Sequence, residues 1–179
     1  MELLRHRICE GGGTAILSTM KNLFCTLLLA LLALGATAQK IKVKKNLMTV
    51  DGQPYARLET DGSALNSTQC YVNSVQGERL FVVKLLYFND PANANPQNIT
   101  GSTTYLQFVF PATGQVAETN QHGLFRALNV ALQLYPARLL KNGVLDPKAV
   151  TEFVYINGTP FSARRQALDR SALLVPVGY

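Results

Sequence analysis

The spacing of the apolar residues changes near residue 120, and this change does most to limit the folds open to the chain. Before it, apolar and polar side chains alternate in short segments such as 41–44, which is the spacing of β-strands. Between residues 124 and 135 the apolar side chains recur every three or four positions, which is the spacing of an amphipathic helix. Strands followed by helices predict an α+β fold.

We expect an antiparallel sheet of about five or six hairpin-connected strands over residues 40–117. Asp51-Gly52 is a tight-turn sequence, because both residues tolerate a positive φ angle. Pro54 cannot donate a hydrogen bond to a neighbouring strand, so one of the strands flanking this turn is expected at an edge of the sheet. The predicted strands cover residues 41–44, 47–50, 55–60, 70–75, 80–88 and 103–110. Segment 80–88 is nearly all apolar, which predicts a central strand that is buried on both faces.

Two or three helices are expected over residues 121–170, packed on one face of the sheet. Asn120 is the predicted N-cap of the first helix, which Pro136 ends. The predicted apolar stripe of this helix consists of Leu124, Phe125, Leu128, Ala131, Leu132 and Tyr135. Asp146 and Pro147 begin the second helix, and Gly158 ends it. Its predicted buried face consists of Val150, Phe153 and Val154. A short third helix over 164–170 and an extended segment over 173–177 complete the expected chain.

Residues 20–38 have the three parts of a secretory signal peptide. Met20 and Lys21 give a positive start, residues 23–34 form an apolar run, and Ala36-Thr37-Ala38 is a small-x-small cleavage site. An uncleaved membrane anchor is the alternative, but the run is 12 residues long and a spanning helix needs about 20. We interpret residues 1–19 as a misassigned N-terminal extension. Residues 39–179 are then a single exported domain, either periplasmic or secreted.

The exported domain is basic. It holds 14 Lys and Arg against nine Asp and Glu, and four of its lysines lie at positions 40, 42, 44 and 45. An exported protein is not expected to meet nucleic acid, so the partner that this charge favours is an anionic surface component, such as lipid head groups or glycans. The alternative, which is the simpler interpretation, is a solvated edge strand whose lysines prevent pairing with other strands.

Few residue types in the domain are suited to catalysis. Cys70 and His122 are the cysteine and histidine that remain after cleavage, so no internal disulfide can form and Cys70 is expected to be buried. The motifs of zinc sites, thiol–disulfide exchange and phosphate-binding loops are absent, and no cofactor or metal is expected. Cys70 with His122 could form a nucleophile–base pair, and Glu59 with Asp61 a pair of carboxylates. The simpler interpretation is a buried thiol, a surface histidine and a solvated strand end.

These observations favour a non-catalytic binding or structural module over an enzyme. The predicted binding residues are Tyr55, Tyr71 and Tyr105 on an exposed face of the sheet, with Asn93 and Asn95 in the long connection at 89–102. The expected partner is an envelope protein or an anionic surface component. The alternative function is a small envelope hydrolase that uses Glu59 and Asp61 or the pair of Cys70 and His122.

The predicted cleavage gives a direct test of export. We expect the protein isolated from the envelope or medium of its native cells to begin at Gln39, because Ala36 and Ala38 fit the two small-residue pockets that signal peptidases read. Intact mass measurement reads the new N-terminus directly. A chain that still carries residues 20–38 would show that the segment is a membrane anchor.

Overall fold

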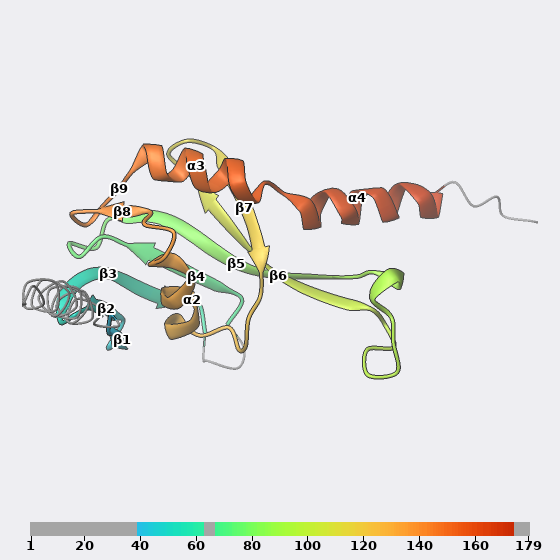
Figure 1. Ribbon diagram of the computed structural model, residues 1–179, viewed down its shortest axis with the longest axis horizontal. Coiled ribbons are helices and arrows are strands. Elements are labelled where there is room, and N and C mark those ends of the chain that lie inside the picture. The colour runs from blue at the N-terminus through green and yellow to red at the C-terminus, as the bar shows by residue number, and fades with distance from the viewer. Residues whose placement is uncertain (1–38, 63–66, 174–179) are drawn as a thin grey trace, which may run out of the picture. The chain divides into compact units, whose positions relative to one another are not determined.

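The computed structural model describes residues 39–62 and 67–173 (Figure 1). The predicted signal peptide, the cleavage residue Ala38 and most of the predicted extended segment at 173–177 lie outside the described residues. No helix within the described ranges is long and apolar enough to cross a membrane.

Seven antiparallel strands form the main sheet, and each pairs with the next strand along the chain. Their bounds are β1 Ile41–Lys44, β2 Leu47–Val50, β3 Gln53–Thr60, β4 Gln69–Asn73, β5 Arg79–Asn89, β6 Ser102–Phe110 and β7 Gln115–Asn120. The predicted α+β class is confirmed, but the sheet has seven strands rather than five or six. The additional strand, β7, carries polar residues such as Glu118 on one face, which hid its period-two pattern. A second small sheet pairs β8 Leu140–Lys141 with β9 Val144–Leu145.

The edges of the main sheet are β1 and β7. The interpretation of the lysine-rich segment as an edge strand is therefore confirmed. The prediction drawn from Pro54 is wrong, because β2 and β3 are both interior strands. Pro54 lies at a β-bulge, where the pairing shifts between Met48 and Thr49 and a proline can be accommodated without a regular ladder bond.

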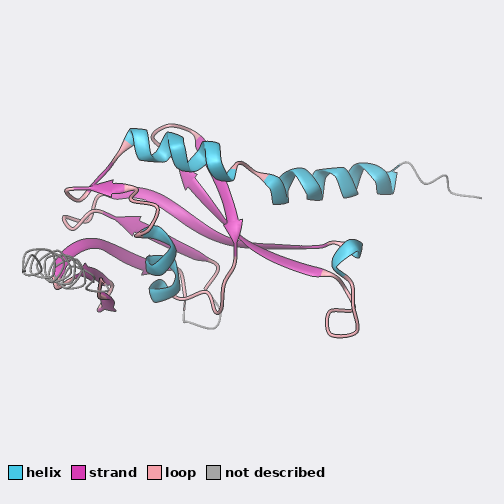
Figure 2. Ribbon diagram, in the orientation of Figure 1, coloured by secondary structure: helices cyan, strands magenta, loops and turns pink. Residues whose placement is uncertain are grey.

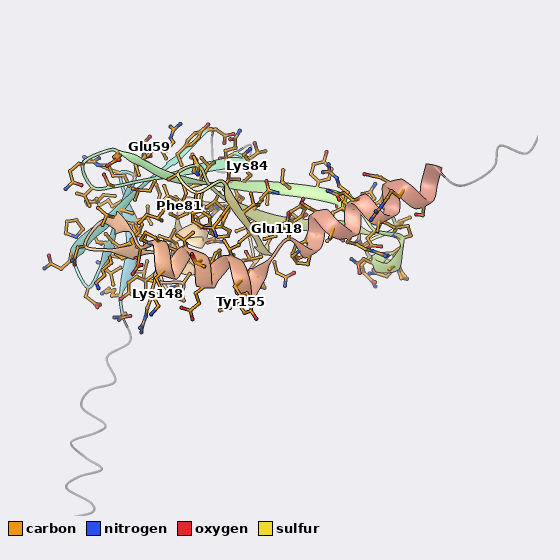
Figure 3. The ribbon with its side chains drawn as sticks, turned by 90° about the horizontal axis from the view of Figure 1, so that it is seen from above. Glu59, Phe81, Lys84, Glu118, Lys148 and Tyr155 are labelled. Carbon is orange, nitrogen blue, oxygen red and sulfur yellow. The ribbon has the colours of Figure 1, made fainter. Side chains whose placement is uncertain are left out.

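One face of the sheet carries the core. Its fully buried side chains include Met48, Leu58, Val72, Phe81, Val83, Phe108 and Phe110. The prediction that β5 is buried on both faces is wrong: Phe81 and Val83 are completely buried, whereas Val82 and Lys84 are only half-buried. In Figure 3, Phe81 lies between the sheet and α3, while Glu59 and Lys84 lie on the far side of the sheet.

Helix α2, Ala127–Leu134, packs on the core face against β1 and β3. It begins later than predicted, because Asn120 is the last residue of β7 and the N-cap position is Arg126, whose side chain makes no capping bond. The predicted apolar stripe is also partly wrong. The helix buries Val130, Ala131 and Leu134, and the leucines Leu124, Leu128 and Leu132 are about half exposed.

Helix α3, Pro147–Asn157, covers the core face near β7. Its predicted ends are confirmed: the Asp146 carboxylate accepts hydrogen bonds from the amides of Lys148 and Ala149, and Gly158 is the C-cap. Phe153 contacts the sheet edge-on, with its ring centroid 5.0 Å from that of Phe108.

Helix α4, Pro160–Leu173, begins on the opposite face of the sheet. The chain passes round the β7 edge at Gly158, whose carbonyl accepts the Glu118 amide at 2.9 Å. Phe161 then stacks on Tyr105, which projects from the face opposite to Phe108, at a centroid distance of 4.8 Å. The helix is longer than the predicted segment 164–170.

Glu118 fixes the start of α4. Its carboxylate is 2% exposed and accepts the amides of Phe161 and Ser162 at 3.0 Å each, the Ser162 hydroxyl, and the Gln107 side-chain amide at 3.1 Å. Free amides at a helix start carry partial positive charge, so a carboxylate there is favourable. One buried side chain therefore joins β6, β7 and α4 (Figure 3).

Strands β5 and β6 continue beyond their other neighbours as a two-stranded arm (Figure 2). Its tip contains a short helical turn, η1 Pro91–Asn93. Arg164 of α4 holds the arm through two bonds to Asp90, of 2.8 and 2.9 Å, and these hydrogen bonds lower the pKa of that carboxyl. Gly101 has a φ angle of +65°, and a Cβ there would lie 1.9 Å from the Asp90 carbonyl oxygen, so only glycine fits. The predicted long connection is therefore a hydrogen-bonded arm tip.

The contacts of Glu118 predict a large loss of stability when it is removed. We expect Glu118→Ala to lower the free energy of unfolding by about 3 kcal/mol, because several buried donors lose their acceptor together. Urea denaturation of the mature protein measures this change. Glu152→Ala, an exposed carboxylate on α3, is the control and should change it by less than about 0.5 kcal/mol. Equal effects of the two substitutions would contradict this role.

Candidate functional site

The described residues leave the face of the sheet opposite the core largely uncovered. Helices α2 and α3 lie on the other side, and the start of α4 contacts this face at Tyr105 and Glu118, on the last two strands, where Phe88 of β5 also packs on Tyr105. An antiparallel sheet with one solvated face normally presents polar side chains there. The uncovered face over β1 to β5 is therefore the surface on which these strands can meet a partner, and we call it the open face.

The strand register brings basic residues into one line across the open face. Lys44 pairs with Leu47, Leu47 with Arg57, Arg57 with Asn73, and Asn73 with Arg79. Directly paired residues project from the same face of a sheet. Lys44, Arg57 and Arg79 thus form a transverse line, the basic row, across five adjacent strands, and all three are exposed.

The basic row belongs to a wider positive surface. Lys42 and Lys84 project from the same face: Lys42 lies two residues from Lys44 along β1, and Lys84 pairs with Gln69, four residues along β4 from Asn73. Within residues 39–62 and 67–173 one ion pair occurs, between Arg164 and Asp90, so none of these five cations has a carboxylate within 4.0 Å. Glu59 is the exposed carboxylate that this part of the face carries. The excess of unpaired positive charge creates a potential that attracts anions.

Two contacts fix the arginines of the basic row. The Arg57 side chain donates from Nε to the Val75 carbonyl at 2.9 Å. The guanidinium carbon of Arg79 lies 4.0 Å from the ring centroid of Tyr71, which is a cation–π contact. An aromatic ring and a planar guanidinium are therefore presented together on the open face.

Asn73 lies in the register between the two arginines, and the oxygen of its side-chain amide is unsatisfied. The residue is 4% exposed, and its Oδ1 atom is buried without a hydrogen-bond partner among the described residues. A buried amide without a partner costs about 1–3 kcal/mol. Such a group in a native structure calls for an explanation, and a ligand is one.

The structure does not bring the three predicted tyrosines together. Tyr71 lies on the open face. Tyr105 projects from the same face but is fully buried by Phe161. Tyr55 packs on the core side, where its ring meets Tyr135 edge-on at 5.4 Å, its hydroxyl donates to the Leu140 carbonyl at 3.4 Å, and burial raises its pKa. The predicted tyrosine surface is therefore reduced to Tyr71.

The predicted asparagines lie at the arm tip, and their side chains stabilise its turn. The Asn93 amide donates to the Thr103 hydroxyl at 2.8 Å. Asn95 accepts the amides of Gln97 and Asn98 at 2.9 and 3.0 Å. Both side chains are exposed, but these bonds occupy them in closing the tip.

The proposed pair of Cys70 and His122 gains no support. Cys70 is completely buried in the core, as the sequence predicted, and burial raises the pKa of its thiol to about 12. His122 is exposed after β7, and no hydrogen bond in the described part of the chain joins the two. A thiol of this kind is not a nucleophile near neutral pH.

The carboxylates Glu59 and Asp61 have separate surroundings. Asp61 accepts the Ser67 hydroxyl at 2.6 Å and the amides of Thr68 and Gln69 at 3.0 and 3.1 Å, and these bonds, led by that of Ser67, lower its pKa. Asp61 therefore stays ionised and holds the entry to β4. Glu59 lies exposed on the open face. The two carboxylates therefore do not form a pair that could act together as acid and base.

The described residues contain no group of three or more His, Cys, Asp or Glu that could hold a metal ion. A hollow of about 480 Å³ near β7 is lined by His122, Glu118, Gln133 and Asn157 among others. Glu118 already accepts the amides at the start of α4, so it is not available as a partner for His122 there.

Comparisons of the chain with protein-family models, with curated proteins and with solved structures found no match.

Arg57, Arg79 and Asn73 did not stand out in the sequence. The available signal was alternation, because Arg57 lies between Ala56 and Leu58, which are both buried. Alternation assigns a residue to a face but does not say which residue lies beside it on the next strand. The basic row is a property of the register and could not be predicted from single strands.

The burial of Cys70 predicts that its thiol is unreactive in the native protein. We expect the mature protein to show no modification by a thiol reagent at pH 8, since the group is both inaccessible and protonated. In denaturant, we expect one thiol per chain to react. Rapid stoichiometric labelling of the native protein would show that Cys70 is accessible and would reopen the question of a reactive thiol.

Proposed function

We propose that this protein is an exported, non-catalytic module that binds a polyanionic component of the cell surface on its open face. The observation that carries the proposal is the set of five cations, Lys42, Lys44, Arg57, Arg79 and Lys84, that project from one face without a carboxylate partner in the described ranges.

The arrangement of these cations favours a partner over a merely solvated surface. Lysines on an edge strand alone would serve to prevent aggregation. Arg57 and Arg79, however, belong to the interior strands β3 and β5, where no free edge needs protection. Arginine is also the more weakly hydrated cation and forms paired bonds to carboxylates, sulfates and phosphates.

The rest of the molecule supports a binding role. Cys70 is buried and protonated, and Asp61 and Glu118 are engaged in hydrogen bonds within the fold. The reactive groups considered above therefore have structural roles, while the charged groups of the open face have few. The predicted signal peptide would deliver such a surface to the envelope, where lipid head groups and acidic glycans are the abundant polyanions.

Binding of dextran sulfate, with neutral dextran as the reference, tests this function. We expect the mature protein to bind dextran sulfate in 50 mM salt, and the affinity to fall as salt increases, because the attraction is electrostatic. The triple variant Lys44→Gln, Arg57→Gln, Arg79→Gln should bind about 100-fold more weakly. That estimate takes roughly 1 kcal/mol for each cation facing an anionic surface.

The matched control removes three exposed cations elsewhere, with the substitutions Lys141→Gln, Lys148→Gln and Arg165→Gln. The net charge of this variant equals that of the first triple variant, so the comparison separates the open face from overall charge. Equal weakening of both variants in calorimetry would show that attraction to the whole chain, and not a site, accounts for the binding. Absence of binding by the unaltered protein would refute the proposed function.

A further inference from the structure

We infer that the ligand of the open face is an acidic polysaccharide, bound across the strands, with a hydroxyl group that pairs with Asn73. This inference rests on the proposed function and names its ligand class. It depends on two features of the basic row: the spacing of its cations and the unsatisfied amide between two of them.

The spacing follows from the sheet. Lys44, Arg57 and Arg79 lie on β1, β3 and β5, which are alternate strands. Adjacent strands are about 4.8 Å apart, so successive cations are separated by roughly 10 Å. A linear polysaccharide with a carboxylate on every second sugar repeats its charge over a comparable length, that of one disaccharide unit. Three such units match the whole basic row.

The unsatisfied amide oxygen of Asn73 favours a glycan over a phosphate as the ligand. Its Oδ1 atom is an acceptor, so the missing partner must be a hydrogen-bond donor. Fully ionised phosphate, sulfate and carboxylate groups offer acceptors only. A sugar hydroxyl can donate to Oδ1 while the neighbouring acidic group of the same chain meets Arg57 or Arg79. A charged and hydroxylated ligand therefore satisfies both parts of the site.

The Oδ1 atom of Asn73 is buried, so a ligand reaches it only when the side chains around it move. The residues paired with it on both sides are the exposed arginines Arg57 and Arg79, and bonds to an incoming carboxylate would replace their contacts with the Val75 carbonyl and the Tyr71 ring. Tyr71, two residues away on the same strand and face, offers a ring beside the site, and sugar rings pack on aromatic faces. Glu59, which pairs with Tyr71, is a carboxylate on the same face and can accept a hydroxyl.

The test uses Asn73→Leu, which replaces the amide with an apolar side chain of similar shape. Because the native amide is unsatisfied, this change should leave the stability unchanged or raise it slightly, so loss of binding will not reflect loss of folding. The probes are hyaluronan hexasaccharide, which has three carboxylates and many hydroxyls, and polyphosphate, which has charge without hydroxyl donors along its chain. Affinities are measured by calorimetry with the mature protein.

We expect Asn73→Leu to bind the hexasaccharide about tenfold more weakly, the equivalent of 1.4 kcal/mol, and to bind polyphosphate unchanged. Equal affinity of the variant and the unaltered protein for the hexasaccharide would overturn the role of the hydroxyl but leave the proposed function in place. Tighter binding of polyphosphate, or of vesicles that contain anionic phospholipid, than of the hexasaccharide would overturn the glycan assignment in favour of a phosphate ligand. Failure of the unaltered protein to bind any of these polyanions would refute both proposals.

Discussion

One-sided burial of the sheet is the constraint on which the rest of this structure depends. Helices α2 and α3 cover one face, and the core between them and the strands is apolar and completely buried. Within residues 39–62 and 67–173 no second layer covers the opposite face over β1 to β5, so its side chains must be compatible with water. This asymmetry explains why charged residues alternate with core residues along β1 and β3, and why a chain of this size can present a wide, basic surface.

Glu118 extends this architecture to the last helix. Without an acceptor at the start of α4, little would hold the chain beyond Gly158 on the face of β6 and β7 opposite the core, because most of the helix is exposed and its apolar contact is centred on Phe161. The carboxylate thus holds a polar helix where apolar packing alone is weak, and Arg164 continues the attachment to the arm through Asp90. Hydrogen bonds and charge determine the position of α4, whereas apolar burial determines that of α3.

The sequence predicted the fold class and most strands because alternation and turn residues are local properties. It also predicted both ends of α3, since Asp146 and Gly158 act within one helical turn. It failed for β7, where the buried polar residue Glu118 interrupts the apolar pattern, and for the exposed side of α2, where Leu128 and Leu132 follow helical spacing but point away from the core. The open-face site was predicted only in part, through Tyr71 and the lysines of β1, because its remaining residues become neighbours through pairing between strands.

The dependence of the basic row on strand register has a consequence for how this surface can evolve. A single inserted or deleted residue within β3 or β4 would exchange the two faces of that strand, moving Arg57 or Asn73 into the core and Leu58 or Val72 into water. Natural variants can therefore change ligand preference by replacing individual side chains, while strand lengths stay constant. Length variation is expected to accumulate instead in connections such as Asp61–Thr68. The ligand-binding surface should therefore diversify by substitution of single residues, while the lengths and pairing of the strands stay the same.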